Sequence, residues 1–343
     1  MLRLKALLMA CLLGVALPAA AQTPIKVSYQ PALFWALPFY LATVQGWWKE
    51  IGLAPEFATF AAGAPQVAAA AARAWDVGGT GSAPAVLGAQ RFGILTIGVT
   101  NDESQANALV ARSKDAARIR ANPASLRGQQ LLVTTNSTGE YAAFACLRHW
   151  GLQPRDMLAM NMGQAQIVSA FSSGNGLLAA VWAPNIATLE DRADSTVVCS
   201  GKEAGATVPG ALVVRADYAR ENPGAVAAFL AVYLRGITWE HTHRAETLDL
   251  MRRFYAEGGV TLPDRFLARE LDTRPTFTLE QQLKLFDRTG GAAVVDGWFS
   301  HLGEYLHDSG TLTQIPEAGS FITSDYLRRV AADPKLTAFA SGQ

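Results

Sequence analysis

The chain has 343 residues, and its 29 basic and 29 acidic residues give a formal net charge of zero at pH 7. This balance excludes a nucleic-acid-binding protein that relies on an excess of Lys and Arg to attract phosphate. Half of the residues are hydrophobic and only 17% are charged, which also excludes a disordered chain. The length predicts two domains, each large enough to bury a core.

The first 21 residues have the pattern of a secretory signal peptide. Arg3 and Lys5 precede an apolar stretch, residues 6–17, and small residues follow up to Ala21. About 12 apolar residues are too few to cross a hydrocarbon layer of about 30 Å, so the pattern does not indicate a membrane anchor. Cleavage after Ala21 would leave 27 basic and 29 acidic residues, a net charge of −2. We therefore expect an exported, soluble protein.

Cysteine usage leaves one question open. Cleavage would remove Cys11 and leave Cys146 and Cys199. An oxidising compartment permits a disulfide between them. Their apolar surroundings equally suit two buried free thiols. Both alternatives stand at this point.

Apolar patterns predict an α/β fold in two units followed by a helical part. The first unit alternates strands with helices, and its predicted strands are 25–29, 53–57, 75–79 and 94–99, with helices 38–48, 66–73 and one that Ser82 would cap. The second unit has predicted strands 130–134, 157–160, 177–182 and 196–199, with helices 139–150, 164–171 and 185–192. A further strand, 211–214, precedes predicted helices 223–243, 247–257, 279–289 and 294–309. Such alternation predicts sheets that are mainly parallel.

Catalytic and cofactor motifs have little support. Residues 174–179 match a dinucleotide-binding pattern by spelling, but its glycines precede a predicted strand, whereas the chemistry needs them to follow a strand and open a helix. The five histidines form no convincing metal set, because His241 and His243 are two apart on a predicted helix and point in different directions. We therefore predict no enzyme activity, no cofactor and no metal.

Small polar residues gather at two predicted helix starts. Gly79-Thr80-Gly81-Ser82 precedes one helix, and Asn136-Ser137-Thr138-Gly139 precedes another. Free backbone N–H groups and hydroxyls at a helix N-terminus bind anions without any basic residue. Aromatic residues follow strands in both units, namely Phe34 and Trp35 in the first and Trp182 in the second. Ordinary capping and core packing would explain each segment alone, but together they indicate ligand capture.

Several segments resemble one protein family in order and spacing. Three of them carry a recognisable motif: Gln45–Leu53 has an aromatic residue after glycine and ends in Gly-Leu, Trp75–Pro84 contains Asp-x-Gly-x-x-Gly, and Leu178–Pro184 contains Trp-x-Pro. The other segments are Leu126–Gln130, Asn136–Thr138 and Glu221–Pro223. Across residues 25–245 the chain resembles periplasmic solute-binding proteins of ABC importers, in the group that binds nitrate, sulfonates and taurine.

The resemblance implies a type II periplasmic-binding-protein fold, with two α/β lobes joined by a two-strand hinge that close on the ligand. Lobe I would comprise residues 22–112 and 209–343, and lobe II residues 113–208. The positions that match the family's cleft are Gln30, Trp35, Gly81, Ser82, Asn136, Ser137, Thr138, Trp182 and Pro184. The implied partners are a small-molecule ligand and an ABC permease with its ATPase, and we expect a periplasmic monomer.

Two positions depart from the family pattern. Leu178 stands where the family often has Asp, and Glu140 stands where it often has His. Glu140 completes a Ser-x-x-Glu capping box with Ser137. Alternatively, its carboxylate faces the cleft and holds a ligand amine, as a zwitterion such as taurine would require. A carboxylate there would repel a simple monoanion such as nitrate.

The favoured ligand is a small organic anion or zwitterion of the sulfonate type. Neutral hydroxyl, amide and backbone N–H donors suit a permanently ionised, weakly basic oxyanion. The alternatives are nitrate, bicarbonate or another small metabolite, or a module that presents its ligand to a membrane sensor. Relatives of this fold also make a pyrimidine precursor, but they use a Cys-rich motif, and this chain has only two isolated cysteines after cleavage.

Overall fold

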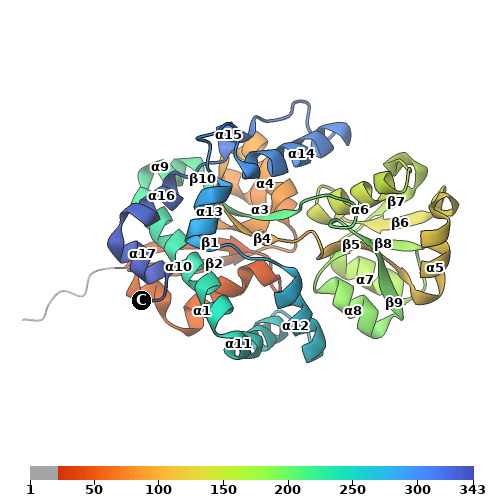
Figure 1. Cartoon of the computed structure of the whole chain (residues 1–343), viewed down its shortest axis with the longest axis horizontal. Coiled ribbons are helices and arrows are strands. Elements are labelled where there is room, and N and C mark those ends of the chain that lie inside the picture. Colours follow the sequence, from red (N-terminus) through yellow and green to blue (C-terminus); the bar gives the residue numbers. More distant parts are fainter. Residues whose placement is uncertain (1–21) are drawn as a thin grey trace, which may run out of the picture.

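A computed structural model describes residues 22–343. The predicted signal peptide, residues 1–21, lies outside the described residues, so cleavage after Ala21 stays a prediction. Figure 1 shows two lobes, and each is built around one five-stranded sheet. The predicted two-lobed α/β fold is confirmed. Within the described residues, no helix is both long and apolar enough to span a membrane.

The first sheet has the strand order β2-β1-β3-β10-β4. Its strands are β1 (Thr23–Tyr29), β2 (Leu53–Thr59), β3 (Val77–Gly81), β4 (Ile94–Asp102) and β10 (Pro209–Arg215). β1 is parallel to β2 and β3, so the carboxyl ends of these three strands lie at the same edge of the sheet. Ile25 and Val27 of β1 are buried, while Lys26 between them is exposed, as expected for a strand with alternating faces.

The second sheet has the order β7-β6-β8-β5-β9. Its strands are β5 (Asn107–Arg112), β6 (Gln130–Val133), β7 (Leu158–Asn161), β8 (Leu178–Trp182) and β9 (Ser195–Ser200). β6 is parallel to β7 and β8, so this sheet repeats the parallel arrangement of the first.

The expectation of mainly parallel sheets is wrong. β10 runs antiparallel to β3 and β4, and β5 runs antiparallel to β8 and β9. Each of these two strands enters its sheet directly from the other lobe instead of through a crossover helix, which removes the constraint that makes neighbouring strands parallel. Half of the pairings in each sheet are therefore antiparallel.

Helices cover both faces of the two sheets. Those around the first sheet are α1 (Leu37–Val44), α2 (Trp47–Glu50), α3 (Gly63–Ala69), α4 (Ser82–Phe92), α9 (Ala216–Glu221), α10 (Pro223–Thr242), α11 (Arg244–Glu257), α12 (Asp264–Thr273), α13 (Leu279–Leu285), α14 (Val294–Asp308), α15 (Ala318–Phe321), α16 (Asp325–Ala332) and α17 (Pro334–Ala340). Those around the second are α5 (Ser113–Ala121), α6 (Thr138–His149), α7 (Gln164–Ser172) and α8 (Asn185–Arg192). The longest, α10, packs against α1, α16 and α17, so the C-terminal helices complete the core of the first lobe.

Some predicted helix boundaries are wrong. The single helix expected over 38–48 is two helices, because Gly46 has φ of +75° between α1 and α2, a left-handed conformation that ends the first helix. The helix expected over 279–289 ends at Leu285. Ser82 does not cap α4, since Gly81 occupies the N-cap position and no side chain caps it.

The two cysteines form a disulfide. Cys146 lies on α6 and Cys199 on β9, and both are fully buried. Of the two alternatives that the sequence left open, the structure contains the bonded one. The bond fastens α6, whose first turn lies at the junction between the lobes, to its own sheet.

The chain crosses between the lobes in two segments, one after β4 and one before β10. They are hydrogen-bonded to each other, with the Glu103 N–H donating to the Val208 carbonyl at 2.7 Å and the Lys202 N–H to the Ser104 carbonyl at 2.9 Å. Residues 107–112 were expected in lobe I, but they form β5 in the second sheet. The boundary at residue 112 was placed too late, because the apolar run that follows the crossing was not recognised as a strand.

Candidate ligand-binding site

Two helix N-termini meet where the lobes touch. α4 begins at Ser82 directly after β3, and α6 begins at Thr138 shortly after β6. A Cβ atom added to Gly81 would lie 2.9 Å from Cγ2 of Thr138, so the backbone before α4 lies directly against the first residue of α6. The first N–H groups of a helix have no partner within it, and the helix dipole adds partial positive charge there. Two such ends at one place favour an anion.

Two hydroxyls beside these helix ends have no hydrogen-bond partner. Thr80 and Ser82 are both fully buried, and Oγ1 of Thr80 and Oγ of Ser82 are unpartnered among the described residues. A buried polar group without a partner costs about 1–3 kcal/mol. Because these two hydroxyls have no partner within the protein, they are suited to donating a hydrogen bond to a bound ligand.

Trp182 and Pro184 lie on the second lobe, at and just after the end of β8. Trp182 ends β8, and a Cβ added to Gly139 would lie 3.0 Å from Cε3 of its indole. The ring therefore lies over the first turn of α6. Pro184 follows at the N-cap of α8. Trp182 thus lies beside the start of α6, where the predicted residues Asn136, Ser137 and Thr138 also lie, and Pro184 opens the neighbouring helix α8.

Gln30 and Trp35 lie in the first lobe. The side-chain amide of Gln30 donates to Gln66, whose own amide donates to Oγ of Ser28 at 2.7 Å and to the carbonyl of Gly79 at 2.8 Å. Trp35 is 1% exposed, and its ring lies so close to Gly79 that a Cβ there would be 2.5 Å away. Both residues are therefore connected to β3, the strand that leads into α4.

Glu140 makes one of the two hydrogen bonds of the predicted capping box with Ser137, and its carboxylate accepts from Asn136 instead of Ser137. Its N–H donates to Oγ of Ser137 at 3.2 Å, and its Oε2 accepts from the N–H of Asn136 at 2.8 Å. The hydroxyl of Tyr305 also donates to Oε2. Burial raises the pKa of Glu140, and the bonds from Tyr305 and Asn136 act in the opposite direction. Both bonds to the carboxylate engage the same oxygen, Oε2, at the start of α6.

Three residues near this junction were missed in the sequence. Tyr305 and Thr311 come from the region of α14, and Oγ1 of Thr311 donates to Oδ1 of Asn136 at 2.8 Å. Arg274, after α12, is buried and donates through Nη2 to the carbonyl of Ala183 at 3.2 Å. The pattern around each of them is that of an ordinary helix or loop, and no local signal indicates that it contacts the other lobe. Among the described residues, no group of acidic, His or Cys side chains is arranged to hold a metal.

The chain matches a family described as NMT1/THI5 like over residues 35–247. It belongs to this family. The taurine-binding periplasmic protein of Escherichia coli is 30% identical over 227 residues, which are 65% of this chain and 68% of that protein.

Solved structures of the same architecture include the periplasmic aliphatic sulphonate binding protein SsuA from Escherichia coli. Its TM-score is 0.72 at 18% identity, covering 88% of this chain and 92% of that one. The periplasmic nitrate-binding protein NrtA from Synechocystis PCC 6803 has a TM-score of 0.69 at 16% identity, with 93% and 91% covered. These likenesses establish the periplasmic-binding-protein fold of the NMT1/THI5-like chain.

Proposed function

We propose that this chain is the periplasmic substrate-binding component of an ABC import system. It would capture a small organic anion or zwitterion of the sulfonate class between its lobes and deliver it to the permease. The observation that carries the proposal is the meeting of the α4 and α6 N-termini at Gly81 and Thr138, beside the unpartnered hydroxyls of Thr80 and Ser82. The proposal is supported by the similar proteins, which are named as binding taurine, sulfonates or nitrate.

The chemistry of the donors favours a sulfonate. Backbone N–H groups and neutral hydroxyls stabilise an oxyanion without a counter-charge, and a sulfonate stays ionised at every physiological pH. The predicted site residues Gln30, Trp35, Asn136, Ser137, Trp182 and Pro184 would form the surrounding walls. Binding without turnover, by a periplasmic monomer, is part of the same proposal.

A thermal-shift screen followed by calorimetry tests the ligand class. The screen would include taurine, ethanesulfonate, an aromatic sulfonate, nitrate and bicarbonate. A ligand at about 100 times its Kd stabilises the folded protein by roughly 2.7 kcal/mol. A shift with sulfonates supports the proposal, whereas a shift with nitrate or bicarbonate alone would overturn the sulfonate assignment.

Ser82→Ala tests the site itself. Because Oγ of Ser82 has no partner in the protein, its removal should leave the unfolding free energy unchanged or slightly higher. Affinity for the sulfonate should fall by about tenfold or more, since a hydrogen bond to a charged group is worth about 1.5–3 kcal/mol. Ser173→Ala, at an exposed serine after α7, is the matched control. Equal affinity in both variants would show that Ser82 does not contact the ligand.

Glu140→Gln separates the two alternatives for Glu140. If the carboxylate holds a ligand amine, the variant loses affinity for taurine but not for ethanesulfonate, which lacks the amine. If Glu140 only caps α6, both affinities change by the same factor.

A further inference from the structure

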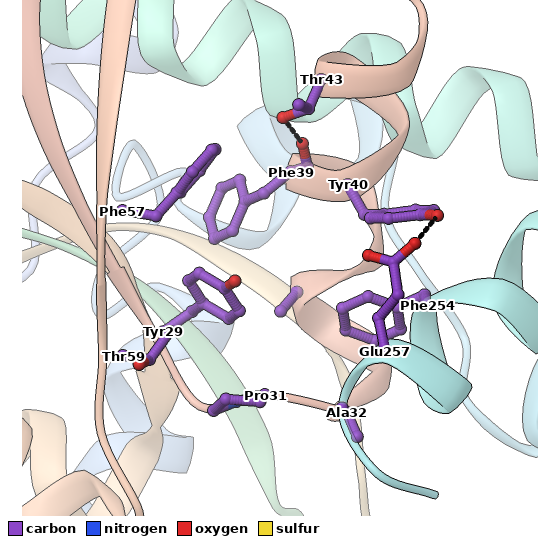
Figure 2. Close-up of a pocket in the computed structure, with 12 residues that line it drawn as sticks. Tyr29, Pro31, Ala32, Phe39, Tyr40, Thr43, Phe57, Thr59, Phe254 and Glu257 are labelled. Carbon is purple, nitrogen blue, oxygen red and sulfur yellow. Dashed lines mark hydrogen bonds between the residues drawn. The ribbon is translucent and has the colours of Figure 1, made fainter. Parts of the chain in front are cut away.

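The first lobe contains a cavity of about 400 Å³ that the proposed function does not use. It lies between the end of β1, the end of β2, α1 and the C-terminal end of α11 (Figure 2). Five aromatic side chains line it, namely Tyr29, Phe39, Tyr40, Phe57 and Phe254. None of the ten predicted ligand-binding residues is among the described residues that line it.

The cavity and the proposed ligand site use opposite faces of β1. Successive side chains of a strand point to opposite faces of the sheet. Ser28 contacts Gln66 of α3, as does Gln30, which directly follows β1, whereas Tyr29 packs against Phe39 of α1 with ring centroids 6.3 Å apart. A ligand in this cavity would therefore be a separate ligand from the one between the lobes.

The aromatic rings lie at steep angles to one another. Tyr29 and Phe57 are perpendicular, with centroids 5.8 Å apart, and Tyr40 and Phe254 are inclined by 50° at 5.6 Å. Phe39 and Phe254 belong to the core of the first lobe, and Figure 2 shows the lining rings on both sides of the start of α1. Ring faces carry partial negative charge, so an arrangement of this kind attracts a cation.

One carboxylate completes the lining. Glu257 lies at the end of α11, and one of its oxygens accepts a hydrogen bond from the Tyr40 hydroxyl at 2.7 Å. Of the described residues that line the cavity, none is basic. Arg253, one turn earlier on α11, lies outside this lining and lowers the pKa of Tyr40, but burial and Glu257 raise that pKa by more. Burial, followed by the charge of Glu257, raises the pKa of Tyr29, so the phenol beside the carboxylate stays neutral.

We propose that this cavity binds an organic ammonium ion. The five rings would contact its alkyl groups and the Glu257 carboxylate would balance its charge. Its volume suits a small alkylated amine, and its combination of rings with a single negative charge would favour such a cation over a neutral molecule of the same shape. The site is independent of ligand capture between the lobes.

Calorimetry with choline and with 3,3-dimethylbutan-1-ol tests the charge requirement, because the alcohol has nearly the same shape without the charge. Choline should bind at least tenfold more tightly, corresponding to about 1.4 kcal/mol, within the range of desolvated cation–π contacts. Equal binding of the two probes, or no binding of choline at millimolar concentration, would overturn the proposal.

Glu257→Gln and Phe57→Leu test the lining. Phe57 is 37% exposed and Glu257 is exposed, so neither change removes a core residue. Each should weaken choline binding at least fivefold, and Glu246→Gln, at an exposed position near the start of the same helix, should not. Sulfonate affinity should be unchanged in all three. Choline affinity that is unaffected by both lining variants would place the cation elsewhere and refute the assignment.

Discussion

The lobes touch on two sides of the hinge, and the two contacts differ in chemistry. On the side of α14, neutral hydroxyls of Tyr305 and Thr311 donate to Glu140 and Asn136 at the start of α6. On the side of α12, three arginines reach the second lobe. Figure 1 shows these two helices on opposite sides of the junction.

The α12 contact itself has a buried part and an exposed part. Arg274 has a side chain 1% exposed and lies between Glu270, at 3.2 Å, and Glu103, at 3.7 Å. Arg265 and Arg269 pair with Asp191 and Glu190 of α8, and both arginines are largely exposed. The comparison leads us to expect that removing the buried arginine costs more unfolding free energy than removing either exposed one.

The largest effect is expected from Arg274→Met. Removing the guanidinium leaves the carboxylates of Glu103 and Glu270 buried without their cation, which should cost about 3–5 kcal/mol of unfolding free energy. Urea denaturation measures the loss. Arg274→Lys keeps the charge and should lose less. A loss under about 1 kcal/mol in Arg274→Met would show that burial of this pair does not dominate the contact.

Tyr305→Phe should have an intermediate effect that grows with pH. The change removes one donor from Glu140 and should cost about 1–3 kcal/mol. A carboxyl whose folded pKa is raised by burial stabilises the protein below its unfolded pKa, and this stability is lost as pH rises through the folded pKa. Loss of the Tyr305 hydrogen bond raises the pKa of Glu140 further. The unfolding free energy of the variant should therefore be lower than that of the wild type by a larger amount at pH 8 than at pH 4.

Tyr326→Phe is the matched control for this measurement. The hydroxyl of Tyr326 donates to the carbonyl of Ala219 at 3.1 Å, and this acceptor does not titrate. The unfolding free energy lost in Tyr326→Phe should therefore be similar at pH 4 and at pH 8. The same pH dependence in the two variants would refute the role assigned to Glu140.

The smallest effect is expected from Arg269→Ala. This arginine is 42% exposed and its pair with Glu190 is in contact with solvent, so its removal should cost less than about 1 kcal/mol. The cost should shrink further in 1 M salt, where exposed charges are screened within about 3 Å. Arg328→Ala, in an exposed pair within α16, is the control for a pair that does not join the lobes. A loss as large as that of Arg274→Met would contradict the comparison.

Much of the fold could be predicted from local patterns. Strand β8 is a continuous apolar run, the first half of β4 is largely apolar, and α8 was predicted with the bounds that the structure has. Pairing direction could not be predicted, because β5 and β10 have the composition of ordinary buried strands and only their entry from the other lobe makes them antiparallel. The polar pattern of residues 113–121 likewise concealed α5, whose burial comes from two residues, Ala116 and Ile119.

The candidate site divides in the same way. Small polar residues before α4 and α6 identified both helix starts, since free N–H groups are a local property of a helix end. The neighbours of those ends come from distant segments, as with Tyr305 and Glu140, which are 165 residues apart in the chain. Contacts of this kind leave no mark on the spacing of residues.

The sequence by itself determined the balance of charge, the two α/β units and the polar helix starts, because each depends on composition or on neighbouring residues, and it predicts an export signal. Tertiary structure alone decided that the two helix starts meet at Gly81 and Thr138, that Cys146 and Cys199 are bonded, and that Arg274 is buried between two carboxylates. The near-zero net charge is compatible with the proposed anion site, which would use helix ends and hydroxyls in place of basic residues.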